Sequence, residues 1–480
     1  MLFNSAEFAL FLPCVLAAFF ATPARWRWLI LLAASYFFYG SWNVYYLTLI
    51  LATTGVTYVA SRAIAAAPNL GRRRGWLIGA VVVNLGILFA FKYFNFFSAS
   101  FAAGCGLFGG DNRPLLLHVA LPVGISFYTF QALGHAVDVY RGDAEPEKRF
   151  GIFALFVAFF PQLVAGPIER SSRLLPQLKK AVTFDYRQAS DGLKLIAWGL
   201  FKKVVIADRL EVYVNGVYGD ASGAGGAQLL IATYFFAFQI LCDFSGYTDI
   251  AIGVAQMFGV KLTQNFHRPY FAQSTPEFWR RWHVTLSTWF RDYLYIPLGG
   301  NRVSRSRWLF NIVIVFLLSG LWHGANWTFA AWGLWHGAAV AVSVLTLARR
   351  EKVATALGLS RLPRWSAAWR MVFTFHWVVF GWVLFRASSI GEGWLIFRKI
   401  FAGEWTGSVT AGVVGRFDFL LAVALIAALL VIEAVRSRVR LRQWVAAQSW
   451  WLRWAIYFCG ATAILLLGVF EKVEFIYFQF

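Results

Sequence analysis

Long apolar stretches recur along the whole chain and constrain its fold more than any other feature. Of its 480 residues, 59% are hydrophobic and only 14% are charged. A helix needs roughly 20 apolar residues to cross the hydrocarbon core of a bilayer. About eleven stretches approach that length, the shorter ones being candidates for tilted, re-entrant or buried helices: 8–21, 28–40, 45–60, 76–97, 195–207, 229–241, 309–321, 327–347, 372–384, 419–432 and 454–470. The sequence therefore predicts an all-α polytopic membrane protein.

Basic residues mark the loops between these stretches. Lysine and arginine number 44 against 23 aspartates and glutamates, an excess that in a soluble protein would suggest a nucleic-acid partner. Here the charges gather in short loops, which is typical of the cytoplasmic side of a membrane protein. The clusters are Arg72–Arg74, Lys179–Lys180, Lys202–Lys203, Arg349–Arg350 and Arg436–Arg442. We therefore expect a lipid bilayer, and no nucleic acid, as the partner.

The same clusters predict on which side each terminus lies. If residues 72–74 are cytoplasmic, the N-terminus is external, and if residues 436–442 are cytoplasmic, the C-terminus is external too. Two external termini need an even number of crossings, whereas the count of stretches is odd. At least one stretch is therefore re-entrant or wrongly divided.

One segment departs from the pattern of spanning helices. Thr275, Pro276 and Glu277 match a helix N-cap, a proline at the first helical position and an acid in the first turn. Apolar residues then recur at helical spacing, with arginines on the opposite side, until residues 297–302 end the helix. The pattern predicts one amphipathic helix within 275–302, lying at the membrane interface or dipping into the protein.

Several common chemistries find no support in the sequence. The four cysteines, Cys14, Cys105, Cys242 and Cys459, have neither CxxC nor Cys/His spacing, so we expect no metal site and no disulfide framework. A Gly-x-Ser-x-Gly elbow and a phosphate-binding glycine loop with lysine are both missing. The chemistry must therefore come from other residues.

Two Trp-His-Gly triplets stand beside apolar stretches, at Trp322–Gly324 and Trp335–Gly337. A histidine at membrane depth is costly unless it faces a protein interior or a wet cavity, so it marks a candidate site. A neutral imidazole can take a proton from a hydroxyl that attacks an activated acyl group. His323 and His336 are thirteen residues apart, roughly 20 Å along a straight helix. Unless the chain bends, one catalytic and one structural histidine is the more economical assignment.

Four blocks of sequence, in order along the chain, resemble the membrane-bound O-acyltransferase (MBOAT) family: Leu121–Gln131, Phe159–Ile168, Arg291–Arg302 and Gly320–Gly337. They are most similar to its bacterial branch, which acts in alginate O-acetylation and teichoic-acid D-alanylation. The resemblance covers nearly the whole chain and implies a single integral-membrane domain over residues 1–480. It further implies about eleven transmembrane helices, with re-entrant or interfacial ones, around a tunnel that joins a cytoplasmic donor to an external acceptor.

The resemblance also implies roles for individual residues. His323 matches the family's catalytic histidine, and His336 matches a second recurrent histidine. Three residues match a block near the tunnel, with an internal ion pair and packing as the alternative: Arg291, Asp292 and Tyr293. Trp322 and Asn326, which flank His323, are further candidate tunnel residues.

Asp243 lies in a polar interruption, residues 243–249, within an apolar region. Carboxylates at membrane depth need partners or water. Packing through Ser245 and Gly246, with the acids bound to arginine or tyrosine, is one interpretation. A place in the lining of the donor tunnel is the other.

The last six residues, 475–480, are mostly aromatic and contain Tyr477. They could form an aromatic belt at the end of the last span. The resemblance implies instead that Tyr477 presents its hydroxyl to the catalytic histidine and carries the acyl group as an ester. A phenol, with a pKa of about 10, is a better leaving group than a sugar hydroxyl.

The function that the resemblance implies is O-acetylation of an extracytoplasmic polysaccharide such as alginate, cellulose or peptidoglycan, from the bacterial inner membrane. The donor would be cytoplasmic acetyl-CoA, used as a substrate, with no permanently bound cofactor. A periplasmic partner resembling the SGNH hydrolases would complete the transfer. The alternatives are a D-alanyl-type acyltransferase and a non-catalytic acyl transporter or scaffold.

Overall fold

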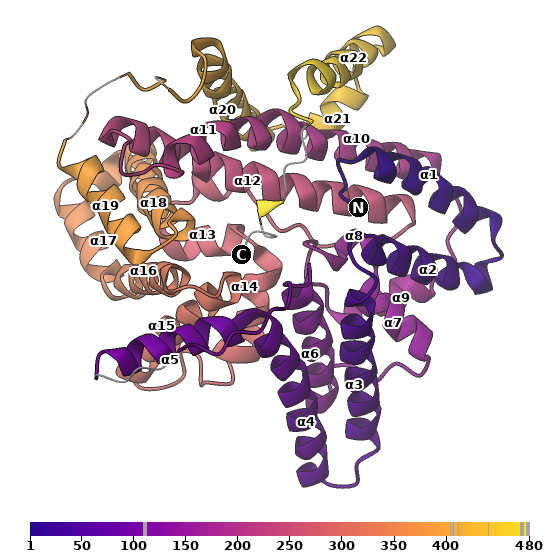
Figure 1. Ribbon diagram of the computed structural model, residues 1–480. Coiled ribbons are helices and arrows are strands. Elements are labelled where there is room, and N and C mark those ends of the chain that lie inside the picture. The colour runs from indigo at the N-terminus through magenta and orange to yellow at the C-terminus, as the bar shows by residue number, and fades with distance from the viewer. Residues whose placement is uncertain are drawn as a thin grey trace. The chain divides into compact units, whose positions relative to one another are not determined.

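The chain is a helical protein made of two compact units (Figure 1). The computed structural model describes residues 1–108, 113–403, 405, 408–410, 412–439, 441–470 and 475–476, with the side chains of 360 and 442 left out. One unit comprises Met1–Ile196 and Thr248–Gln264, and the other comprises Ala197–Tyr247 and Asn265–Phe480. The described residues contain helices and loops but no strand. The prediction of an all-α fold is confirmed, whereas the single domain over 1–480 stays a prediction.

The first unit contains ten α-helices in chain order, the last of which ends just beyond it. They are α1 (Ala6–Ala21), α2 (Arg27–Gly40), α3 (Tyr46–Ala66), α4 (Leu70–Leu88), α5 (Phe94–Gly106), α6 (Ile125–Arg141), α7 (Phe150–Ala158), α8 (Phe160–Leu163), α9 (Ser171–Lys179) and α10 (Tyr186–Leu200). Two short segments add to them, the 3₁₀-helix η1 (Ala24–Trp26) and the π-helix η2 (Phe89–Tyr93). The long helix α12 (Gly226–Met257) begins in the second unit and ends in the first.

The second unit contains the remaining helices. They are α11 (Asp208–Tyr218), α13 (Thr275–Arg281), α14 (Val284–Phe290), α15 (Arg305–His323), α16 (Trp327–Leu345), α17 (Leu347–Ala356), α18 (Pro363–Arg386), α19 (Ile390–Phe401), α20 (Arg416–Arg436), α21 (Leu441–Ala446) and α22 (Trp450–Leu467). Its short segments are the π-helices η3 (Phe201–Ala207) and η5 (Arg291–Tyr295) and the 3₁₀-helices η4 (Pro269–Phe271) and η6 (Leu359–Arg361).

Eight helices of the described residues are long and apolar enough to cross a membrane. They carry eight of the apolar stretches seen in the sequence, with α4, η2 and α5 running on as one helix, Leu70–Gly106. The other three stretches fall on the shorter helices α1 and α2 and on the junction of α10 with η3. The polytopic character is therefore confirmed, and the three short stretches lie on helices shorter than a full span, as expected for tilted, re-entrant or buried ones.

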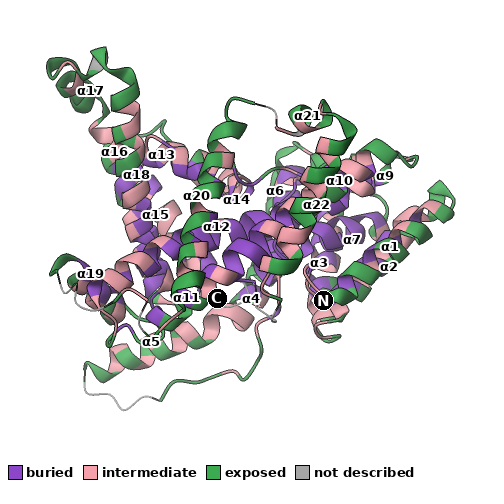
Figure 2. Cartoon of the chain, turned by 90° about the horizontal axis from the view of Figure 1, so that it is seen from above, coloured by how far each residue is buried: buried purple, intermediate pink, exposed green. Residues whose placement is uncertain are grey.

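Burial separates two kinds of apolar helix (Figure 2). In α12, 78% of the most apolar window is buried inside the protein, whereas in α22 none of it is. Tryptophans and phenylalanines line the surface of α22, as Trp454 and Phe458 illustrate. Because apolar side chains need an apolar surrounding, α22 is suited to contact with lipid, whereas α12 is mostly buried inside the protein.

Two of the four family-like blocks pack together in the core of the first unit. Gly124, just before α6, has a φ of 76°, and a Cβ there would lie 2.9 Å from the carbonyl oxygen of Leu163. Only glycine fits both the left-handed backbone and this close approach. Gln131 donates from Nε2 to the carbonyl of Phe156 (2.6 Å), and Gln162 donates to the same oxygen (3.0 Å). The blocks Leu121–Gln131 and Phe159–Ile168 thus form one buried, hydrogen-bonded unit.

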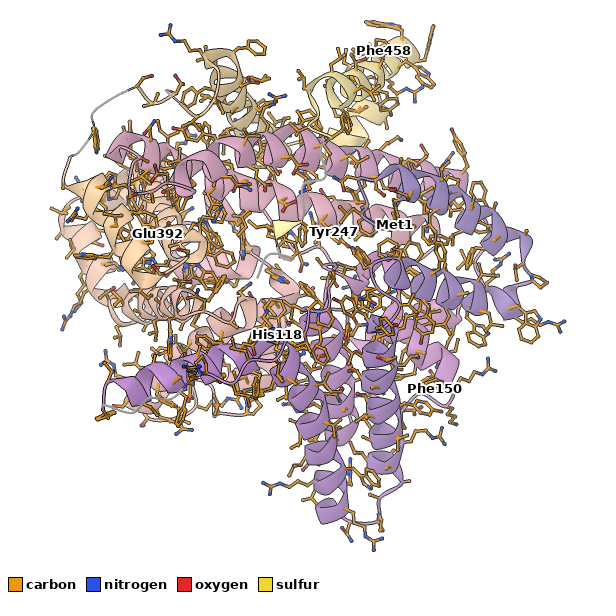
Figure 3. The ribbon with its side chains drawn as sticks, viewed as in Figure 1. Met1, His118, Phe150, Tyr247, Glu392 and Phe458 are labelled. Atoms are coloured by element: carbon orange, nitrogen blue, oxygen red, sulfur yellow. The ribbon has the colours of Figure 1, made fainter. Side chains whose placement is uncertain are left out.

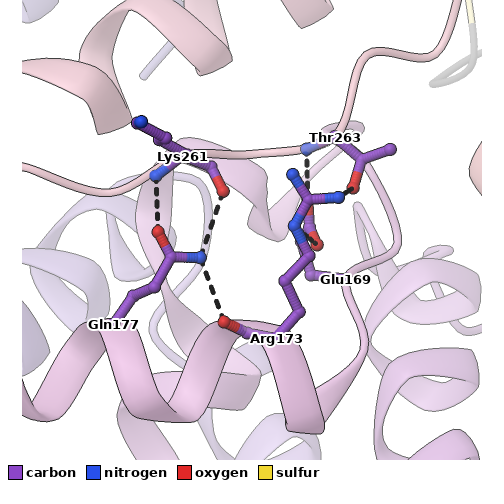
Figure 4. A network of polar contacts seen from close by, with 5 residues as sticks. All are labelled: Glu169, Arg173, Gln177, Lys261 and Thr263. Carbon is purple, nitrogen blue, oxygen red and sulfur yellow. Dashed lines mark hydrogen bonds and ion pairs between the residues drawn. The ribbon is translucent and has the colours of Figure 1, made fainter.

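A polar network fixes the segment after α12 to α9 (Figure 4). Buried Glu169 accepts a hydrogen bond from the backbone N–H of Thr263, while Arg173 donates to the Thr263 hydroxyl (2.8 Å). The Gln177 amide accepts from Lys261 N–H (2.8 Å) and donates to its carbonyl (3.2 Å). Both backbone groups of Lys261 are therefore satisfied without a regular ladder.

The segment 275–302 differs from its prediction. Ser274, not Thr275, is the N-cap, accepting from the N–H of Glu277 at 3.3 Å. The helix stops after Arg281, and the chain turns through His283, whose φ of 43° is left-handed, before α14 and η5 follow. The apolar face is buried, as Trp282 shows. The amphipathic pattern was right, but one continuous helix was wrong because the pattern carries no mark of a left-handed residue.

Candidate functional site

The candidate site is built on the hairpin of α15 and α16 in the second unit. A Cβ on Gly320 would lie 2.2 Å from the Phe329 carbonyl oxygen, and one on Gly333 would lie 2.4 Å from that of Phe316. Such glycines let two helix backbones approach closely. His323 is the last residue of α15, so the hairpin places it at the turn.

Asn326 holds that turn. Its side chain caps α16 by accepting from the N–H of Thr328 (3.0 Å), the usual work of an N-cap asparagine. Its Nδ2 donates to the carbonyl of Ser388 (3.0 Å). Both ends of the amide are thus used to fix backbone beside His323. The expected place of Asn326 in a tunnel wall stays a prediction.

The imidazole of His323 is buried among aromatic rings. His323 is only 3% exposed. Its ring centroid lies 5.0 Å from that of Trp322, 5.1 Å from that of Trp332 and 5.5 Å from that of Phe385, each in an edge-to-face arrangement. This geometry is the favoured one for aromatic pairs, and it fixes the plane of the imidazole.

His336 belongs to the same aromatic cluster. Its ring lies 5.0 Å from Trp332 and 5.0 Å from Trp279, and the residue is fully buried. Among the described residues neither of its nitrogens has a hydrogen-bond partner. The helix α18 passes close by, since a Cβ on Gly381 would lie 2.8 Å from His336 Nε2.

The two histidines are closer than a straight helix would allow. The roughly 20 Å expected for thirteen residues does not apply, because the chain turns back between Gly324 and Asn326. Both imidazoles contact the indole of Trp332. The spacing argument that separated a catalytic from a structural histidine therefore fails, and the roles must be argued from chemistry.

A third histidine, His283, was missed in the sequence. It is buried in the left-handed turn before α14, and its ring lies 4.7 Å from Phe244 and 6.1 Å from Trp322. Burial lowers the pKa of His283 to about 3, so the imidazole is neutral near pH 7. The overlooked signal is a Trp-His pair, Trp282-His283, which repeats the pairs at His323 and His336.

Asn265 fixes the unusual turn that carries His283. Its backbone carbonyl accepts from the N–H of Val284 (3.0 Å), and its side-chain oxygen accepts from the N–H (3.1 Å) and the hydroxyl (2.7 Å) of Thr285. A non-glycine residue in the left-handed region costs about 1 kcal/mol or more and persists only where its surroundings impose it. The turn therefore points to a positional demand on His283.

The described part of the C-terminal segment, Phe475 and Ile476, is buried next to this cluster. The Phe475 ring lies 4.8 Å from Tyr247, labelled in Figure 3, and 5.8 Å from Phe244. Phe244 in turn contacts His283. Phe475 is therefore linked to the histidine cluster through Phe244. Tyr477 lies outside the described residues.

Asp243 is partnered by a lysine rather than by the arginine or tyrosine expected. Its carboxylate forms an ion pair with Lys203 (2.8 Å), which also pairs with Asp208 (2.7 Å). The second Asp243 oxygen accepts from the backbone N–H of Ile476 (2.8 Å). Asp243 thus binds the side chain of Lys203 and the backbone of Ile476 at once.

The block at residues 291–293 forms the π-helix η5, a geometry often found at functional sites. Arg291 pairs with Asp292 (2.7 Å), but the Arg291 side chain is 60% exposed. The ion pair therefore lies at the surface of its unit rather than inside it. Tyr293 packs on Trp289 with ring centroids 5.1 Å apart. A tunnel role for these three residues stays a prediction.

A model of the membrane-bound O-acyltransferase family matches residues 149–390, which include all three clustered histidines. The chain is 41% identical over 409 residues to the probable alginate O-acetylase AlgI of Azotobacter vinelandii, covering 85% of this chain and 79% of that protein. It is 37% identical to the peptidoglycan O-acetyltransferase of Helicobacter pylori, covering 81% and 78%. The teichoic acid D-alanyltransferase of Streptococcus thermophilus is 29% identical over 55% of this chain and 68% of its own length.

Proposed function

The chain belongs to the membrane-bound O-acyltransferase family and is a multi-pass membrane O-acyltransferase, and we propose that it takes acetyl groups from cytoplasmic acetyl-CoA to O-acetylate an extracytoplasmic polysaccharide. The observation that carries the proposal is the buried, aromatic-walled imidazole of His323 at the turn of the α15–α16 hairpin. It is a proton acceptor in a site with little water, where the geometry of a general base is fixed in advance.

In the proposed reaction His323 accepts the proton of an attacking hydroxyl. The hydroxyl oxygen forms a bond to the acetyl carbonyl carbon, and the bond from that carbon to the CoA sulfur breaks. The proton on the imidazole then passes to the CoA thiolate, which restores neutral His323. Proton transfer by a positioned side chain contributes about 10²- to 10⁴-fold to a rate. His336 and His283 contribute polar rings to the same cluster and pack against its tryptophans. His336 is also a second candidate for direct proton transfer.

The first acceptor in this proposal is the phenol of Tyr477. It follows directly on Ile476, whose buried position beside the cluster supports the assignment. The phenol ester stays activated for a second transfer, because a group with a pKa of about 10 leaves more readily than a sugar alkoxide. A periplasmic partner of the SGNH-hydrolase kind would accept the acetyl group and pass it to the polymer.

The relatives favour acetyl over D-alanyl as the acyl group. The alginate and peptidoglycan O-acetylating relatives match more of the chain, with higher identity, than the D-alanylating one. We accordingly propose an inner-membrane enzyme acting on an alginate-like polymer, cellulose or peptidoglycan. Family membership favours this over a transporter or scaffold without chemistry.

The proposal is tested by supplying membranes that contain the protein with acetyl-CoA labelled in its acetyl group, with and without a periplasmic extract. We expect label on the protein in both cases and label in a polysaccharide only with the extract. Digestion of the labelled polymer with alginate, cellulose and peptidoglycan hydrolases then identifies it. Labelling from D-alanyl donors, but not from acetyl-CoA, would overturn the choice of acyl group.

A further inference from the structure

A buried ionic cluster lies beneath the described C-terminal residues. The Lys203 ammonium lies 2.7 Å from Asp208 and 2.8 Å from Asp243. The three side chains are 7%, 0% and 3% exposed in that order. Lys203 is carried by the π-helix η3, and Asp243 by α12. A π-helical turn is rare and is often kept for a side chain whose position matters.

The cluster holds two carboxylates for one ammonium. A buried carboxylate is strongly unfavourable unless further donors satisfy its oxygens. For Asp243 that donor is the backbone N–H of Ile476 at 2.8 Å, 233 positions along the chain. Hydrogen bonds to charged groups are stronger than those between neutral ones. The backbone of Ile476 therefore supplies Asp243 with a donor in addition to Lys203.

The residues that lead into the C-terminal segment are tied to the same elements. Arg209 of α11 donates to the carbonyl of Leu467 (2.8 Å), and the N–H of Val469 donates to the carbonyl of Val204 in η3 (2.9 Å). With the bond from Ile476 to Asp243, this makes three tethers between residues 467 and 476. Leu467, Val469 and Ile476 are thus each hydrogen-bonded to the unit that carries the cluster.

We propose that Asp243, held by Lys203, is a positioning residue that anchors the C-terminal segment through the backbone of Ile476. The anchor fixes Phe475 against Phe244, which contacts His283. Its purpose rests on the proposed function, in which Tyr477 receives the acetyl group near His323.

A backbone hydrogen bond can be removed without touching the ionic cluster. Ile476→Pro deletes the N–H, because proline has none, whereas Ile476→Val keeps it and changes the side chain by one methylene. Asp243→Asn removes the charge at the other end of the bond. Asp208→Asn is its matched control, since Asp208 pairs with Lys203 while Asp243 carries the bond to Ile476.

The position of the segment can be read from the reactivity of one thiol. Phe475 is only 2% exposed, so a Phe475→Cys chain, with Cys14, Cys105, Cys242 and Cys459 replaced by alanine, carries a protected thiol. We expect Ile476→Pro to raise its alkylation rate by a maleimide at least about tenfold, the loss expected for a hydrogen bond to a charged group. Asp243→Asn should raise the rate by less, because the amide oxygen still accepts a hydrogen bond but carries no charge. Ile476→Val and Asp208→Asn keep the rate of the parent.

The same variants, with Phe475 restored, are then labelled from acetyl-CoA. We expect Ile476→Pro and Asp243→Asn to lose label on the protein in proportion to the release of the segment. An unchanged alkylation rate in both of these variants would show that the bond from Ile476 to Asp243 does not hold the segment in place. Faster alkylation with undiminished label would overturn its role in positioning the acceptor. A parent protein that takes no label contradicts the proposed function, and the alkylation rates then decide the anchor alone.

Discussion

His323 and His336 contact the same indole, with ring centroids 5.1 Å and 5.0 Å from that of Trp332. The hairpin of α15 and α16 creates this relationship by turning the chain back between the two histidines. His283 joins them through Trp322. Two tryptophans thereby hold three imidazoles, those of His323 on α15, His336 on α16 and His283 in the turn before α14.

His336 has no hydrogen-bond partner among the described residues, so its polarity does not contribute to stability there. Replacing a buried, unpaired polar group with an apolar one of similar shape is nearly neutral or stabilising. His336→Phe should therefore keep or raise the thermal unfolding midpoint in detergent. If His336 moves protons, the same variant should lose at least about 10²-fold in acetyl transfer. Retained transfer would assign His336 to packing.

Trp332 should matter for stability as well as for activity, because it is fully buried and contacts both histidines. Trp332→Ala should cost about 3–5 kcal/mol, as for large aromatic residues in cores. Trp454→Ala, at a position 66% exposed on α22, is the control. Thermal unfolding of the two variants measures the difference. Equal losses would mean that Trp332 does not hold the cluster.

The close approach of α15 and α16 depends on glycine. Gly320→Ala would place a Cβ 2.2 Å from the Phe329 carbonyl, which forces the helices apart. We expect lower yields of folded protein and loss of labelling from acetyl-CoA. Gly79→Ala meets nothing within 4 Å and should be neutral or slightly stabilising, because alanine is the better helix former. Similar behaviour of the two variants would contradict the packing described.

His283 should give the protein a pH-dependent stability. Its pKa is lowered by burial from 6.5 to about 3, so between these values the unfolded chain binds a proton that the folded chain does not. The free energy of unfolding is therefore unaffected by this proton above pH 6.5. It decreases as the pH falls towards 3, by up to about 1.4 kcal/mol per pH unit. His283→Asn should reduce the slope of unfolding midpoint against pH between 6.5 and 5. An unchanged slope would show that His283 is solvated.

Much of the fold was predictable, because hydrophobic stretches report on burial in lipid or core. Every apolar stretch of the sequence lies on a helix. The break at His283 was not predictable from spacing, since a left-handed residue leaves the apolar pattern on both sides intact. The amphipathic pattern still placed the buried face, as Leu286 and Phe290 show.

The candidate site was predictable only in part. Its histidines at 323 and 336 stand out because imidazole is costly at membrane depth. The proximity of these two histidines was not predictable, because it depends on the turn of three residues between α15 and α16. The bond between Asp243 and Ile476 spans 233 positions, and no local pattern connects residues so far apart. His283 could have been found from its Trp-His pair.

If His323 activates the hydroxyl that takes the acetyl group, acetylation of the protein itself must depend on this imidazole. Membranes with the parent protein, His323→Ala or Tyr477→Phe are given acetyl-CoA labelled in the acetyl group, and the protein is digested and its peptides are analysed by mass spectrometry. We expect an acetyl ester on Tyr477 in the parent, no ester at residue 477 in Tyr477→Phe, and a rate of acetylation at least about 10²-fold lower in His323→Ala. Labelling of Tyr477 at the parent rate in folded His323→Ala would contradict this role of His323.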